Sequence, residues 1–257
     1  MSAALTGRVY LVTGGSKGFG LAIARSLVSQ GARVGLLGRN EDSLAQAVAE
    51  LGDENAISVA ADVAKKSQVS AAFYHIKNHF GRLDGLINNA GMARPSPVEK
   101  LLEDEVLMQV NTNFLGTVFC CQAVIPLLRG GENPRIVNIS SASAWHYDEM
   151  HHLSIYAATK AAVERFTRDL RMELREEGIG VTCIRPGGAW TNFSDGWNEE
   201  ALKAGINAWH NSGPLMDTGM EAKHVADAVV HSLSYPPGVA IDLLEVRPNQ
   251  AVAKLKL

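Results

Sequence analysis

The sequence predicts one doubly wound α/β domain, with a seven-stranded, mostly parallel sheet and helices on both faces. Short runs of branched apolar residues alternate with longer stretches of helical period over most of the chain. This alternation is typical of parallel strands joined by crossover helices. A glycine-rich turn follows the first apolar run at once, and no linker or low-complexity segment divides residues 1–257. We therefore expect a single domain over the whole chain.

The first unit is a strand that leads directly into a helix. Residues 8–13 (R-V-Y-L-V-T) are a run suited to a buried strand, and the apolar residues of the stretch 19–30 share one helix face. A second helix is expected after Asn40, because asparagine is a good N-cap residue and two acidic residues follow it. The other predicted strands cover residues 33–37, 57–60, 84–87, 135–139, 180–184 and 239–246.

Residues 188–220 depart from this regular pattern. They combine glycines and a proline with four large aromatic residues in a poorly periodic setting: Trp190, Phe193, Trp197 and Trp209. A long irregular insertion is uncommon in a compact domain unless it serves as a lid or a binding loop. We expect a substrate lid at 188–220, and a plain surface excursion with its own apolar cluster is the alternative.

Composition narrows the class of protein. The chain is 46% hydrophobic and has 24 Lys+Arg against 27 Asp+Glu, for a net charge of -3. Surfaces that follow nucleic-acid phosphates or anionic membranes normally leave a basic excess, so we expect neither partner. No signal-peptide pattern is present, and no apolar run approaches the roughly 18 residues of a membrane span. Three cysteines, two of them adjacent, favour a reducing, cytoplasmic location over a disulfide framework.

The glycine-rich turn predicts a site for a diphosphate. Its sequence T-G-G-S-K-G-F-G covers Thr13–Gly20 and runs straight into the first helix. Glycines allow a tight turn and let the backbone approach a ligand closely, while the helix N-terminus offers free N–H groups and a positive partial charge. The position between the first strand and the first helix is what a dinucleotide site requires.

Further motifs follow this turn in order along the chain. They are Asp62-Val63, Asn88-Asn89-Ala90-Gly91, Asn113-x-x-Gly116, Ser141, Tyr156-x-x-x-Lys160, and Pro186-Gly187 with Thr191. Together with the glycine turn, this order resembles the short-chain dehydrogenase/reductase family over residues 13 to 191. The resemblance implies a Rossmann-type fold, an oxidoreductase acting on CH–OH groups and a nicotinamide cofactor.

The resemblance also implies the cofactor-binding residues. These are Gly14, Ser16, Lys17, Gly18, Phe19, Gly20, Arg39, Asp62, Val63, Asn89, Ala90, Gly91, Tyr156, Lys160, Pro186, Gly187 and Thr191. An NAD site normally places a carboxylate at the end of the second strand to hold the ribose hydroxyls. Here that strand ends Leu37-Gly38-Arg39, and Lys17 adds a second cation. Each cation near a 2′-phosphate contributes roughly 1 to 2 kcal/mol, so we expect NADP(H).

Tyr156 and Lys160 are four residues apart in a helical stretch and so share a helix face. A phenol has a pKa near 10, and an ammonium about 5 Å away favours the phenolate by roughly 3 kcal/mol, so the tyrosine can act as acid or base. The resemblance implies that Tyr156 exchanges the proton, that Lys160 also holds the nicotinamide ribose, that Ser141 polarises the carbonyl oxygen and that Asn113 holds a water for proton relay. Ser140 is the alternative to Ser141.

The substrate side is less determined. We expect a bulky, apolar ketone to contact Ser141 and five further residues: Trp145, His146, Tyr147, Trp190 and Phe193. The leading hypothesis is an NADPH-dependent carbonyl reductase; the alternatives are a 3-oxoacyl thioester reductase and a non-catalytic NADP-binding protein. No metal is expected, although three histidines lie near the site: His146, His151 and His152. The resemblance implies a homodimer or homotetramer that pairs through the helices of Asn113 and Tyr156.

Overall fold

A computed structural model describes residues 5–146 and 151–254. The main sheet has seven parallel strands in the order β3-β2-β1-β4-β5-β6-β10. The strands are β1 (Val9–Thr13), β2 (Arg33–Gly38), β3 (Ala56–Ala60), β4 (Gly85–Asn88), β5 (Arg135–Ile139), β6 (Gly180–Pro186) and β10 (Leu243–Val246). The order reverses between β1 and β4, so the predicted doubly wound fold is confirmed. The last strand is shorter than the predicted 239–246.

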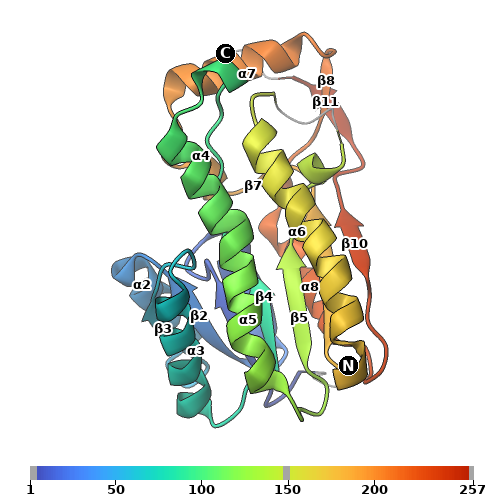
Figure 1. Ribbon diagram of the computed structural model, residues 1–257. Helices are drawn as coiled ribbons and strands as arrows, with labels where there is room; N and C mark the ends of the chain where they lie inside the picture. The colour runs from blue at the N-terminus through green and yellow to red at the C-terminus, as the bar shows by residue number, and fades with distance from the viewer. Residues whose placement is uncertain (1–4, 147–150, 255–257) are drawn as a thin grey trace.

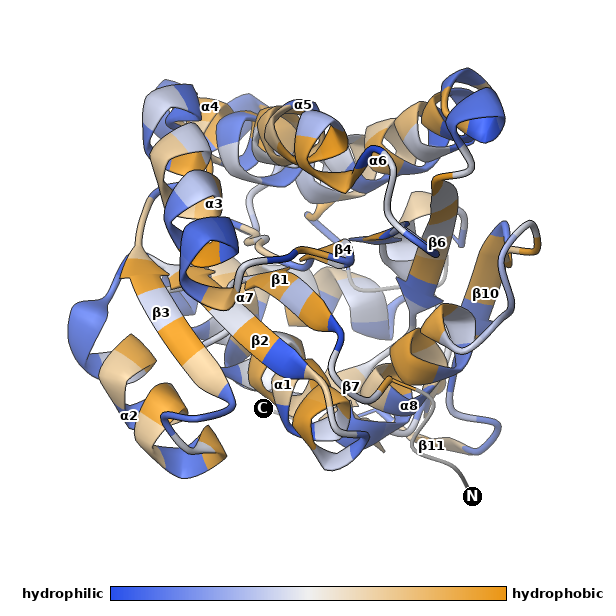
Figure 2. Cartoon of the chain, turned by 90° about the horizontal axis from the view of Figure 1, so that it is seen from below, coloured by the Kyte–Doolittle hydropathy of each residue, from blue (hydrophilic) through white to orange (hydrophobic). Residues whose placement is uncertain are grey.

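Helices cover both faces of the sheet (Figures 1 and 2). Their bounds are α1 (Gly18–Ser29), α2 (Glu41–Leu51), α3 (Lys66–Phe80), α4 (Glu103–Gln109), α5 (Gly116–Leu128), α6 (Ser154–Glu173), α7 (Glu199–His210) and α8 (Ala222–Leu233). α1, α2 and α8 pack on one face, and α3, α5 and α6 pack on the other, each around its own apolar cluster. α2 begins as predicted, because the side chain of Asn40 accepts a hydrogen bond from Ser43 N at 2.7 Å.

The strand side chains explain why two clusters form. In β1, Tyr10 and Val12 point into the cluster under α1 and α8, whereas Val9 and Leu11 point into the cluster under α3 and α5. Successive side chains of a strand face opposite sides of a sheet, so a run that is apolar at every position indicates a strand buried on both faces. All five residues of β1 are buried.

One continuous helical stretch, Glu103–Leu128, is long and apolar enough to cross a membrane by length and composition alone. From the sequence we expected no such run. Helices that pack against the core of globular proteins meet the same criterion, and part of this stretch packs into the apolar cluster under the sheet. Its second half, α5, buries Cys120, Cys121 and Val124 to 1% exposure or less beneath the sheet and runs beside α6 (Figure 1).

The segment 188–220 is more regular than predicted. It contains the helix α7 and three short strands: β7 (Ala189–Trp190), β8 (Leu215–Asp217) and β9 (Met220–Glu221). β7 pairs with β9, and β8 pairs with β11 (Ala251–Ala253) near the C-terminus. Helix α7 has a sequence signal that the irregular reading missed: Asn198 caps it by accepting from Ala201 N at 3.0 Å, and two glutamates follow.

Candidate active site

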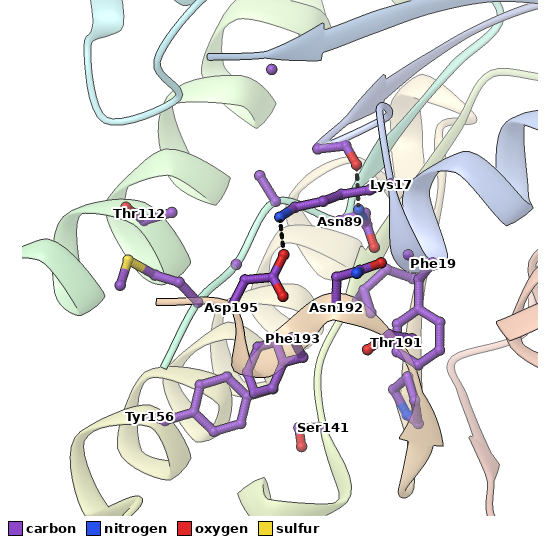
Figure 3. Close-up of a pocket in the computed structure, with 18 of the residues that line it drawn as sticks. Lys17, Phe19, Asn89, Thr112, Ser141, Tyr156, Thr191, Asn192, Phe193 and Asp195 are labelled. Atoms are coloured by element: carbon purple, nitrogen blue, oxygen red, sulfur yellow. Dashed lines mark hydrogen bonds and ion pairs between the residues drawn. The ribbon is translucent and has the colours of Figure 1, made fainter. Parts of the chain in front are cut away.

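A pocket of about 920 Å³ lies at the carboxyl ends of the strands. Its wall comes from the turn after β1, the loops after β2, β4, β5 and β6, helix α6 and residues 189–197. Ligands of doubly wound sheets bind at this edge, near the point where the strand order reverses. Figure 3 shows how side chains from these separate segments converge on the pocket.

The glycine-rich turn has the geometry that the sequence predicts. Gly14 and Gly18 adopt left-handed backbone angles, with φ of +63° and +55°, which residues with a Cβ rarely adopt. A Cβ on Gly20 would collide with the carbonyl oxygen of Gly14 and lie 2.7 Å from Asn89 Nδ2. Gly20 therefore lies behind the turn and supports it, while Gly14 and Gly18 line the pocket.

Asn89 joins the loop after β4 to this turn. Its side-chain Nδ2 donates to the carbonyl oxygens of Thr13 at 2.9 Å and Gly14 at 3.3 Å. The hydroxyl of Thr13 accepts in return from the backbone N–H groups of Asn89 and Ala90, both at 3.0 Å. These reciprocal hydrogen bonds hold two predicted cofactor segments in one rigid wall.

The two predicted cations differ in their surroundings. Lys17 Nζ makes an ion pair with Asp195 Oδ2 at 2.8 Å, across the mouth of the pocket (Figure 3). Arg39 is exposed, lines the pocket and makes no hydrogen bond or ion pair with another described residue. Asp62 and Val63 border the same end of the pocket, and Asp62 Oδ1 accepts from Ala64 N at 2.9 Å.

Helix α6 carries Tyr156 and Lys160 on the face that borders the pocket. Tyr156 is 8% exposed and Lys160 is 4% exposed. Lys160 Nζ donates to the carbonyl oxygen of Ile139 at 2.8 Å and lies 5.8 Å from the centre of the Tyr156 ring. Burial disfavours the charged ammonium and lowers the pKa of Lys160 to about 8. The site thus holds a phenol next to an amine that changes charge near neutral pH.

Asn113 lies behind this pair, in a π-helix (Val110–Leu115) between α4 and α5. Single π-turns inside helices are frequent at functional sites. The fully buried Asn113 side chain accepts from Met92 N at 2.8 Å, and its Nδ2 donates to Met92 O at 2.8 Å and to Thr159 Oγ1 at 3.0 Å. Asn113 therefore fastens the loop after β4 to helix α6, instead of lining the pocket itself.

The two candidate serines after β5 have different partners. Ser141 Oγ lies 2.9 Å from Ser143 Oγ and borders the pocket on the side of Tyr156 (Figure 3). Ser140 is buried, and its hydroxyl donates to Glu164 Oε1 at 2.8 Å. The Ser140 hydroxyl is therefore already hydrogen-bonded to helix α6. The Ser141 hydroxyl is bonded within its own loop, to Ser143, and borders the pocket.

Comparison with known proteins agrees with this geometry. A family model for short chain dehydrogenase matches residues 8–202. The chain belongs to the short-chain dehydrogenase family. An uncharacterized oxidoreductase of Staphylococcus epidermidis is 32% identical over 241 residues, which are 94% of this chain and 97% of the relative. One from Staphylococcus aureus is 32% identical over 244 residues, or 95% and 98% of the two chains.

Solved short-chain dehydrogenases have the same fold. The closed form of a serine dehydrogenase complexed with NADP+ is 30% identical, with a TM-score of 0.81 over 97% of this chain and 98% of its own. Levodione reductase is 29% identical, with a TM-score of 0.78 over 94% and 96%. The chain is therefore an oxidoreductase of a family that binds nicotinamide cofactors.

Only some of the residues expected to contact the substrate line the pocket of this short-chain dehydrogenase. Phe193 lines the pocket, with its ring centre 5.2 Å from that of Tyr156. Trp145 and Trp190, each 67% exposed, and His146 are not among the described residues that line it. Tyr147 lies outside the described residues. The aromatic patterns in the sequence could not separate pocket positions from exposed ones.

His146 belongs to a cluster of charges behind the site. Its Nε2 lies 2.6 Å from Glu245 Oε1, and Glu245 Oε2 accepts from Arg185 at 2.8 Å. Arg185, with a side chain only 7% exposed, also donates twice to Glu164, at 2.8 and 2.6 Å. Ser140 reaches this cluster as well, through Glu164. No group of three or more metal-ligating side chains is present among the described residues.

Two charged residues of the pocket were not predicted as site residues: Arg94 and Asp195. Trp197, an aromatic residue of the predicted lid, lines the pocket as well. The ring of Trp197 packs edge-on against Phe193, with centres 5.7 Å apart. Arg94 follows the N-N-A-G motif closely. Its place in the chain, just beyond a strand that feeds the pocket, was the available signal.

Proposed function

We propose that the protein is an NADPH-dependent carbonyl reductase, which reduces a ketone to a secondary alcohol and catalyses the reverse oxidation. One observation carries the proposal: Tyr156, Lys160 and Ser141 border the same pocket as the glycine-rich turn. A proton donor, a cation beside it and a hydroxyl next to a dinucleotide site are the groups that carbonyl reduction needs. The names of the solved relatives, a reductase and a dehydrogenase, support the same reaction type.

The cofactor would lie along the pocket from the turn to helix α6. The turn and the N-terminus of α1 would hold its diphosphate, Asp62 and Val63 its adenine end, and Thr191 its carboxamide. We assign the 2′-phosphate to Arg39, because this exposed guanidinium stands where an NAD enzyme has a carboxylate. The NADP+ complex of the related serine dehydrogenase supports this choice.

When bound, NADPH supplies the hydride to the carbonyl carbon. Tyr156 Oη donates a proton to the carbonyl oxygen, which becomes the hydroxyl of the product alcohol. Ser141 Oγ donates a hydrogen bond to the same oxygen and stabilises the negative charge that develops there. The ammonium of Lys160 stabilises the resulting phenolate, and proton exchange with solvent restores the phenol.

Asn113 acts as a positioning residue in this scheme. Its hydrogen bonds to Met92 and to Thr159 hold the loop after β4 against α6, which carries both Tyr156 and Lys160. A shift of α6 by a fraction of an ångström would move the proton donor away from the carbonyl oxygen, to which catalysis is sensitive.

A free carbonyl compound fits the pocket better than a thioester on a carrier protein. A carrier would need a basic docking surface at the mouth, and Arg94 and Lys100 are the two cations that the sequence offers for it. Arg94 is 21% exposed and lines the pocket, which leaves it poorly placed for docking. We expect a cytoplasmic enzyme, because all three cysteines are free and buried, and an oligomer formed through α5 and α6.

Replacement of Tyr156 by Phe tests the function. NADPH consumption, followed by absorbance, is measured over a panel of ketones, quinones and oxoacyl thioesters. Tyr156→Phe is expected to lower kcat by at least about a hundredfold, because the phenolic proton is lost. Tyr74→Phe, which removes a hydroxyl from a 54% exposed tyrosine on α3, is the matched control. Undiminished turnover in Tyr156→Phe would contradict the proposal.

A further inference from the structure

Arg94 is held in the pocket wall by the backbone around it. Its N–H donates to Oε1 of the fully buried Gln109 at 3.1 Å, and its Nη1 donates to the carbonyl oxygen of Ala93 at 2.9 Å. The nearest carboxylate is that of Glu105, with Oε1 3.8 Å from Arg94 Nε, which is beyond hydrogen-bond distance. The guanidinium is thus held in place, and its ion pair with Glu105 forms without a hydrogen bond to that carboxylate.

The lid segment continues the pocket wall beside Arg94. A Cβ placed on Gly196 would lie 3.3 Å from Arg94 Nη2, so the lid backbone and the guanidinium are in close contact. The next residue, Trp197, contacts Phe193, and Phe193 contacts Tyr156. This chain of contacts connects the proposed proton donor to Arg94 along one side of the pocket.

Trp197 lines the same pocket as Arg94 and carries a further N–H donor. Its indole Nε1 is buried, and it has no hydrogen-bond partner within the described chain. Buried indole N–H groups usually find an acceptor, because leaving one unpaired costs free energy. Because Trp197 lines the pocket, a ligand bound there is a candidate acceptor for this N–H.

The other charges of the pocket already have roles or partners. Six charged residues line it: Lys17, Arg39, Asp62, Arg94, Lys160 and Asp195. Lys17 and Asp195 pair with each other, Arg39 and Asp62 belong to the adenosine end, and Lys160 accompanies Tyr156. Arg94 is the charge of this set that the proposed function does not use, and it borders the same pocket as Tyr156.

We propose that Arg94 and the indole N–H of Trp197 bind a carboxylate of the substrate, so that the enzyme acts on oxo acids. Two donors on adjacent elements match the two oxygens of a carboxylate, and guanidinium is the side-chain group best suited to such an anion. The inference rests on the proposed carbonyl reduction and adds its substrate class. Arg94 is then the residue that distinguishes an oxo acid from a neutral ketone.

The test compares acids with their esters. Acetoacetate, levulinate and their methyl esters are offered with saturating NADPH to the native protein, Arg94→Gln, Arg94→Lys and Trp197→Phe. For at least one of the two acids, the native protein is expected to have a higher kcat/KM than for the methyl ester of that acid. In Arg94→Gln the acid-over-ester ratio of kcat/KM should fall about ten- to a hundredfold, since a hydrogen bond to a charged group is lost. Arg94→Lys should retain an intermediate ratio, and Trp197→Phe should lose about tenfold or less.

A surface variant and a binding measurement complete the design. Lys100→Gln removes an exposed cation outside the pocket and should keep the native ratio. The Kd of levulinate for the protein in the presence of NADP+, measured by calorimetry, is a readout that needs no turnover. Equal acid-over-ester ratios in the native protein and Arg94→Gln, with ketones still reduced, would overturn the carboxylate site alone. Arg94-dependent binding of levulinate without reduction of any ketone would support the site and refute the proposed reaction.

Discussion

Replacement of Lys160 by Met tests how much the buried ammonium contributes to turnover. Lys160 Nζ lies 5.8 Å from the centre of the Tyr156 ring. At an effective dielectric constant near 20, a unit positive charge at this distance stabilises a phenolate by about 3 kcal/mol. Loss of that stabilisation lowers kcat by about a hundredfold. Met has a similar length and no charge, so the helix packing around it is retained.

The assay must separate turnover from cofactor binding, because Lys160 is also proposed to hold the nicotinamide ribose. We would measure kcat for ketone reduction at saturating NADPH and, separately, the Kd for NADPH. Removal of the ammonium leaves the carbonyl of Ile139 without its donor, which costs about 1–3 kcal/mol of stability, so Tm is recorded too. Lys66→Met, at an exposed position at the start of α3, is the control. A fall in kcat of less than about threefold at saturating NADPH would refute the electrostatic reasoning.

Four further predictions follow from the same site. kcat/KM for NADPH in the reduction should fall as pH rises through about 8, since Lys160 loses its proton there; a profile flat to pH 10 or above would contradict this. Arg39→Gln should raise KM for NADPH about tenfold and leave KM for NADH nearly unchanged. Asp195→Asn should change Tm little, because both partners of its pair with Lys17 are more than half exposed, and should tighten NADPH binding by a few-fold, measured by titration. Gly20→Ala should abolish NADPH binding, as its methyl group meets the Gly14 carbonyl; retained binding would show that the turn can shift.

Much of the fold could be predicted because β1 and its neighbours are apolar on both faces. Continuous apolar runs such as Val9–Thr13 have few alternatives to a buried parallel strand once helical stretches separate them. The irregular reading of 188–220 failed at α7, where four widely spaced aromatic residues obscured the capping signal of Asn198. Local cap chemistry was the better guide to structure there than apolar periodicity.

Within the candidate site too, features that are local in sequence could be predicted, and contacts between distant segments could not. The turn around Gly14 and the pair Tyr156 and Lys160 are local in sequence, so their geometry follows from one turn and one helix. The ion pair between Lys17 and Asp195 joins residues far apart in the chain, and no periodicity encodes such a partner. Whether an aromatic residue such as Trp145 faces the pocket or solvent depends on loop packing, which sequence spacing does not determine.

The charge cluster around Arg185 has a consequence for synthesis on the ribosome. Glu164 on helix α6 is bound to Arg185 on β6, which is bound in turn to Glu245 on β10. A nascent chain that has already formed the cofactor turn and α6 still lacks this outer strand and its carboxylate. A single domain generally folds as a unit, so we expect a nascent chain to acquire NADPH binding only after β10 has emerged from the ribosome. Ribosome-stalled chains that end before and after β10, assayed for NADPH binding, would test this.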